Sequence, residues 1–178
     1  MVITQIIDAI DRLSLWLGRI AAACSLAIAL VTALVVLWRY VFQGGSLALQ
    51  ESINYLFAAI FMLGAALTLK RQGHVRVDIF YRHFTARTQA WIDSVGTIVF
   101  LLPLTAVIGL LSIDYVSSAW SIRERSPDPG GLPAVYWWKT LIPMMAASLF
   151  LQGCAELLRN LLVLTAPATG GEGSAADD

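Results

Sequence analysis

Four long stretches without a charged residue limit what this chain can fold into. They cover residues 20–38, 52–69, 94–113 and 140–155. An α-helix crosses the hydrocarbon core of a bilayer with about 20 mostly apolar residues, so each stretch approaches spanning length. Only 13% of the 178 residues are charged and 58% are hydrophobic, whereas soluble domains carry about 25% charged residues. We therefore predict an all-α integral membrane protein with four transmembrane helices.

The predicted spans form one membrane domain over residues 1–165. They cover about 20–38, 52–69, 94–113 and 138–158, the last being extended over the aromatic residues before the charge-free stretch and the leucines after it. The N-terminal residues before the first span place isoleucine and leucine at helical spacing, which predicts an amphipathic interfacial helix. The second loop, around 76–87, mixes apolar and basic residues and predicts another. Residues 166–178 are small and polar, and we expect a disordered tail.

Basic residues in the flanks predict the orientation, because cytoplasmic loops retain Lys and Arg. Placing both termini and the second loop in the cytoplasm puts eight basic residues inside and four outside. The chain would then be a multi-pass membrane protein with both termini cytoplasmic. The loop 126–133, rich in Pro and Gly, would form a defined external turn.

The predicted membrane interior is chemically quiet. None of the four stretches contains a charged residue or a histidine, which usually mark ion paths, proton relays and substrate sites in membranes. The two histidines lie in the second loop and the two cysteines in different spans, so haem ligation, thiol chemistry and an intramembrane hydrolase have no support. With zero net charge the chain does not suggest nucleic acid binding. We expect no enzyme activity, no cofactor and no metal.

One stretch carries more information than the rest, from the start of the second span into the second loop. Glu51 opens the span, Gly64-Ala65-Ala66 lies within it, and the sequence from Arg71 to Asp78 reads Arg-Gln-Gly-His-Val-Arg-Val-Asp. Taken singly, these residues indicate only a well-terminated helix, with an acid near the positive end of its dipole and bases near the negative end.

Together these residues resemble the small membrane subunit of TRAP transporters, the tripartite ATP-independent periplasmic uptake systems, in its DctQ-like family. The first span agrees, since it ends in Trp38-Arg39-Tyr40-Val41-Phe42, and so does the third loop, Ser126-Pro127-Asp128-Pro129-Gly130-Gly131-Leu132-Pro133. Further matches are Lys139, Ile142-Pro143 and residues 151–156. The resemblance covers roughly residues 15 to 160.

The resemblance implies a small permease subunit of the bacterial inner membrane that braces a large, DctM-like transport subunit and helps a periplasmic solute-binding protein to dock. The system would import an organic acid or a similar solute by symport, driven by an ion gradient, and the second loop would contact membrane lipids. No substrate site is expected in this subunit. The candidate partner and interface residues are Arg39, Glu51, Arg71, Gly73, His74, Arg76, Asp78, Arg123, Arg125, Asp128, Gly130, Gly131, Pro133, Lys139 and Glu156.

Two other functions remain open from the sequence. A homo-oligomeric channel would need a polar stripe along a pore, and no span offers a convincing one. A membrane assembly or accessory protein unrelated to transport would also lack charged residues and histidines in its spans. Its partners would be proteins other than a large permease and a solute receptor.

Overall fold

The protein is an all-helical bundle in a computed structural model that describes residues 2–71 and 84–165. The helices are α1 (Val2–Val41), α2 (Leu47–Lys70), α4 (Ala86–Gly96), α5 (Leu102–Ser121), α6 (Val135–Lys139) and α7 (Leu141–Thr165), with a π-helical turn, η1 (Thr97–Leu101), between α4 and α5. Four helical stretches are long and apolar enough to cross a membrane: Ile3–Val41, Leu47–Lys70, Ala86–Ser121 and Val135–Thr165. The predicted all-α membrane bundle with four spans is confirmed.

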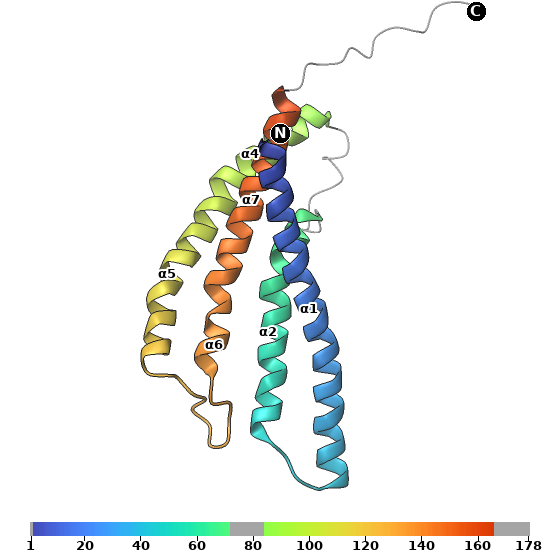
Figure 1. Cartoon of the computed structure of the whole chain (residues 1–178), viewed down its shortest axis with the longest axis vertical. Helices are drawn as coiled ribbons and strands as arrows, with labels where there is room; N and C mark the ends of the chain where they lie inside the picture. The colour runs from blue at the N-terminus through green and yellow to red at the C-terminus, as the bar shows by residue number, and fades with distance from the viewer. Residues whose placement is uncertain (1, 72–83, 166–178) are drawn as a thin grey trace, which may run out of the picture.

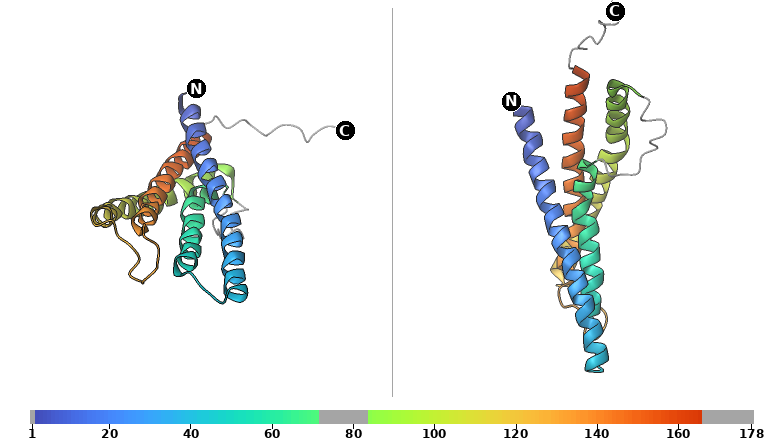
Figure 2. Two further views of the ribbon diagram at one scale, coloured as in Figure 1. Left: turned by 60° about the horizontal axis from the view of Figure 1, so that its bottom comes forward. Right: turned by 90° about the vertical axis from the view of Figure 1, so that its right-hand side faces the viewer.

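The long helices lie side by side in the order α5, α7, α2, α1 (Figure 1). Helix α1 packs along α2, and its N-terminal part also reaches α7. The start of α1 and the end of α7 meet at one end of the bundle, which we call the terminal end (Figure 1). The connections 42–46 and 122–134 lie at the opposite end, which we call the far end (Figures 1 and 2).

The predicted N-terminal interfacial segment is the first half of α1. The helix runs through 40 residues without a break, and at 1.5 Å per residue it is about 60 Å long. That is about twice the 30 Å hydrocarbon core of a bilayer, so α1 projects well beyond the predicted span. Most of the predicted second-loop helix falls on residues 72–83, outside the described residues.

The third span is a composite helix because proline interrupts its hydrogen bonding. Pro103 stands in the first turn of α5, where its ring cannot donate a hydrogen bond and crowds the preceding turn. The chain widens into η1 just before it, and the Leu102 amide donates to the carbonyl of Thr97. The hydroxyl of Thr105 donates to the Leu101 carbonyl one turn earlier at 2.7 Å, a side-chain bond of the kind that often bends helices.

Small residues let the helices approach closely. Leu17 and Ala21 of α1 pack with Ala59 and Leu63 of α2 in a buried cluster. A Cβ added to Gly18 would lie 2.1 Å from a methyl carbon of Leu67, so a larger residue at position 18 would have to displace the Leu67 side chain between α1 and α2. Small-residue contacts are how helices associate where lipid removes the hydrophobic drive between them.

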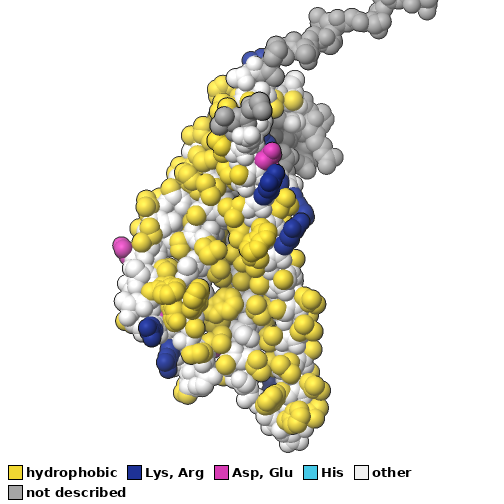
Figure 3. Space-filling view, viewed as in Figure 1, with side chains coloured by type: hydrophobic (Ala, Val, Ile, Leu, Met, Phe, Trp, Pro, Cys, Tyr) yellow, Lys and Arg dark blue, Asp and Glu magenta, His cyan; other side chains and the backbone are white. Residues whose placement is uncertain are grey.

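The outside of the bundle is apolar. Hydrophobic side chains spread over the helix surfaces in Figure 3. Phe61 of α2 is 70% exposed, and Leu111 of α5 is 73% exposed. A soluble protein rarely leaves such patches uncovered, and a membrane or a partner in the membrane would cover them.

Candidate functional site

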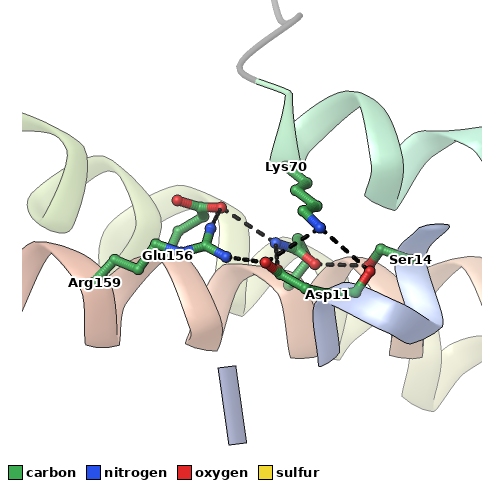
Figure 4. A network of polar contacts seen from close by, with 6 residues as sticks. Asp11, Ser14, Lys70, Glu156 and Arg159 are labelled. Carbon is green, nitrogen blue, oxygen red and sulfur yellow. Dashed lines mark hydrogen bonds and ion pairs between the residues drawn. The ribbon is translucent and has the colours of Figure 1, made fainter. Parts of the chain in front are cut away.

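Six polar side chains meet at the terminal end, in what we call the Asp11 cluster: Asp11 and Ser14 of α1, Lys70 of α2, and Gln152, Glu156 and Arg159 of α7 (Figure 4). The Asp11 carboxylate is its centre. It pairs with the Lys70 ammonium at 3.2 Å, with the Arg159 guanidinium, and accepts from the Gln152 amide at 3.2 Å. One carboxylate thereby joins three helices.

Helical spacing brings these residues together. Gln152, Glu156 and Arg159 lie four and three residues apart on one face of α7, where Arg159 also pairs with Glu156. The Gln152 amide donates to Glu156 at 3.2 Å. Ser14 lies one turn after Asp11 and donates to the Gln152 carbonyl oxygen at 2.6 Å.

Two members of the cluster are buried, the other four are partly exposed, and their buried polar atoms are all paired. Gln152 is fully buried and Ser14 is 2% exposed, yet no buried side-chain nitrogen or oxygen in the described part of the chain lacks a partner. Two carboxylates face two cations, so the cluster carries no net charge. A buried polar group is stable only when it is paired, and this arrangement suits a fixed joint between helices.

At the far end, the Glu51 carboxylate holds the third loop. It accepts a hydrogen bond from the Ser126 hydroxyl at 2.5 Å and another from the Leu132 amide at 2.7 Å. Glu51 belongs to the second turn of α2, so it ties the loop between α5 and α6 to a different helix. The Ser126 amide closes the loop by donating to the Leu132 carbonyl at 3.0 Å.

The two glycines of this loop have separate structural reasons. Gly130 adopts a φ of +83°, which side chains disfavour. A Cβ on Gly131 would lie 2.4 Å from the Ser126 hydroxyl and 2.7 Å from a Glu51 carboxylate oxygen. The loop can reach Glu51 only with glycine at position 131.

Lys139 is also held within the chain. Its ammonium pairs with Glu124 at 2.5 Å and lies 4.2 Å from the centre of the Tyr115 ring. These contacts join the start of the last span to α5 and the third loop. Lys139 therefore stabilises the far end from within.

Aromatic residues add to this joint. Tyr55 of α2 stacks on Trp138 of α6 with ring centres 5.4 Å apart. The Trp120 ring meets Tyr136 edge-on at 4.8 Å, and its indole N–H donates to the Thr140 hydroxyl at 3.0 Å. Aromatic residues of this kind mark membrane–water boundaries.

The predicted interface residues fall into three groups. The side chains of Glu51, Lys139 and Glu156 are engaged inside the chain. A second group is exposed at the surface or in the third loop: Arg39, Arg71, Arg123, Arg125, Asp128, Gly130 and Pro133. The third group, Gly73, His74, Arg76 and Asp78, lies outside the described residues.

Sequence reasoning missed most of the Asp11 cluster. Of its six residues only Glu156 was a candidate; the others, Asp11, Ser14, Lys70, Gln152 and Arg159, were not. The available signal was the face formed by Gln152, Glu156 and Arg159 on α7, where polar residues at helical spacing follow an apolar stretch. That signal gives no partner helix.

Between the two ends the polar side chains bond locally. Ser25 donates to the Ala21 carbonyl, Thr68 to the Gly64 carbonyl, and Ser148 to the Met145 carbonyl. In residues 2–71 and 84–165 no group of three or more His, Cys, Asp or Glu side chains is arranged to hold a metal. The polar chemistry of the described chain is concentrated at the ends of the spans.

The fold and its polar joints define a multi-pass helical membrane protein. Residues 28–163 match the family model for the DctQ component of tripartite ATP-independent periplasmic transporters. The match covers more than half of the chain, so the chain belongs to this family and is a small subunit of a TRAP transporter, as the sequence resemblance implied. A comparison with curated proteins found no match.

Proposed function

We propose that the chain braces the large, DctM-like subunit of a TRAP transporter in the bacterial inner membrane and helps the periplasmic solute-binding protein to dock. The system would import an organic acid or a similar solute by symport with an ion gradient. The observation that carries the proposal is the pair of internal joints. At each end of the bundle an ion pair or hydrogen bonds tie separate parts of the chain together, and the outer surface between the two ends is apolar.

The bracing role rests on rigidity together with exposed apolar surface. Asp11 fixes α1, α2 and α7 at one end, and Glu51 fixes α2 and the third loop at the other. A subunit built in this way has few ways to move its own helices, while the exposed apolar faces of α1 and α5 are free to pack on a membrane partner. The moving parts and the coupling ions belong to the large subunit.

The docking role rests on the third loop. Glu51 fixes its course, and the loop then presents Arg123, Arg125 and Asp128 at its surface. A preorganised loop loses little entropy on binding, and exposed charges steer a partner and select it. In the orientation given by the basic residues, this loop faces the periplasm. The choice of an organic acid as solute rests on the family resemblance.

Copurification tests the proposal. The chain is tagged at its C-terminus and extracted mildly from native membranes, and the proteins present in equal amount are identified by mass spectrometry. We expect a large subunit of about a dozen helices and, with solute, a periplasmic receptor. Replacing Arg123 and Arg125 by Gln should release the receptor and retain the large subunit. The matched control replaces Arg12 and Arg19, an exposed pair on α1, and should retain both.

Purification of the chain alone as a defined homo-oligomer would overturn the bracing role, and conductance of that oligomer in liposomes would support a channel. Stoichiometric copurification with proteins other than a permease and a solute receptor would support an accessory function instead.

A further inference from the structure

A basic stripe runs along the outer face of α1 at the terminal end. Arg12, Trp16 and Arg19 are four and three residues apart, so they share one face of the helix, and all three are exposed, Trp16 by 63%. The buried residues of this part of α1, including Ser14 and Leu17, face the rest of the bundle. Figure 3 shows basic side chains gathered on the side along which α1 runs.

The two arginines differ from the two cations of the Asp11 cluster. Lys70 and Arg159 are neutralised by carboxylates in the Asp11 cluster. In residues 2–71 and 84–165 no carboxylate pairs with Arg12 or Arg19. Asp8 lies one turn before Arg12 on the same side of the helix and is also exposed. Arg12 and Arg19 together outweigh this acid, so the stripe keeps a net positive charge.

The same face continues as leucine. Leu26 and Leu30, seven and eleven residues beyond Arg19, are 65% and 63% exposed. At 1.5 Å per residue they lie about 10 and 16 Å further along the helix, which is the depth of one leaflet of a bilayer whose core is about 30 Å thick. Along the helix the face thus offers Arg12, Trp16 and Arg19 in turn, and then a leaflet's depth of apolar side chains.

We propose that this face, the α1 stripe, binds an anionic phospholipid. The phosphate and headgroup would lie against Arg12 and Arg19, the Trp16 ring between them would lie at the level of the headgroups, and an acyl chain would run along Leu26 and Leu30. A soluble anion would contact only the arginines. A phospholipid would contact the arginines with its headgroup and the exposed leucines with its acyl chain, in the order in which they follow along the helix. The proposal does not depend on the proposed function.

Native mass spectrometry tests the proposal on the full chain with the subunits that copurify with it. The protein in mild detergent is titrated with phosphatidylglycerol or with phosphatidylcholine of the same acyl chains. We expect wild type to prefer phosphatidylglycerol. An arginine near an anionic lipid changes binding about fivefold, so replacing Arg12 and Arg19 by Gln should reduce this preference about 25-fold.

Three further variants sharpen the test. The charge-conserving pair R12K/R19K should keep most of the preference, and D8N should raise it about fivefold because it removes the acid of the stripe. The pair R123Q/R125Q, exposed at the far end, should leave the preference unchanged. Each of these results supports the α1 stripe as the site.

Three results would overturn the proposal. Phosphatidylglycerol binding by R12Q/R19Q equal to that of wild type would show that the arginines bind no lipid. An equal loss with R123Q/R125Q would show a general effect of charge. Release of the large subunit by R12Q/R19Q, with lipid binding unchanged, would assign the arginines to an acidic protein surface.

Discussion

Replacing Asp11 by Asn is the sharpest test of the joint at the terminal end. The substitution keeps the shape of the side chain and removes its charge, so the ion pairs with Lys70 and Arg159 are lost together. The three side chains are only 16%, 21% and 32% exposed, in the order Asp11, Lys70 and Arg159. Solvent therefore screens these pairs less than it screens pairs on an open surface.

The expected loss follows from these contacts. Hydrogen bonds to charged groups contribute about 1.5 to 3 kcal/mol each. Asn can still accept weaker bonds from the same donors, so we expect the two weakened pairs to lower the free energy of unfolding by about 3 kcal/mol. For a chain of this length, this corresponds to a fall in melting temperature of about 6 to 12 °C.

Thermal unfolding of the purified protein in detergent measures this effect. The matched control is Asp8→Asn, which removes the same charge from an exposed position three residues earlier and should change stability by less than about 0.5 kcal/mol. The double variant with Arg159→Gln should lose less than the sum of the single losses, because the two residues share one interaction. Equal melting temperatures for the Asp11 and Asp8 variants would refute the reasoning.

Three other predictions concern close contacts. Gly131→Val should push the third loop off Glu51 and reduce solute uptake while membrane insertion, measured by fractionation, stays normal; unchanged uptake would argue against a docking role. Glu51→Gln should weaken the same loop and speed its cleavage by added protease about tenfold, and an unchanged rate would contradict the clamp. Gly18→Val should lower the melting temperature by crowding Leu67, and Leu67→Ala should partly restore it; no restoration would count against that contact.

The spans were predictable because bilayers exclude charge. Stretches free of charged residues therefore identify helices that can cross the membrane, and all four were found in the structure. The ends of the helices were less predictable, since a helix can continue past its apolar part. Helix α1 begins at Val2, although the charge-free stretch begins at residue 20.

Pairing between distant residues was not predictable. Asp11 and Arg159 are 148 positions apart, and nothing local in the sequence selects one carboxylate for one guanidinium. Glu51 was noticed for its place at the start of a helix, where the dipole gave a sufficient local explanation, and Lys70 was not a candidate. The structure adds a tertiary contact to each, which the local explanation could not contain.

The position of these charges explains how a subunit with the proposed bracing role can do without charged residues in the middle of its spans. Glu51 and Lys70 are 19 residues apart on α2, about 28 Å along the axis, and each is tied to another part of the chain. Lys139 and Glu156 stand at corresponding places in the last span and are tied as well. The separation on α2 matches the hydrocarbon core of a bilayer, about 30 Å. Each charge can then stay at the membrane boundary while it fastens one end of the bundle, so the depth of the helices and their mutual packing are fixed by the same contacts.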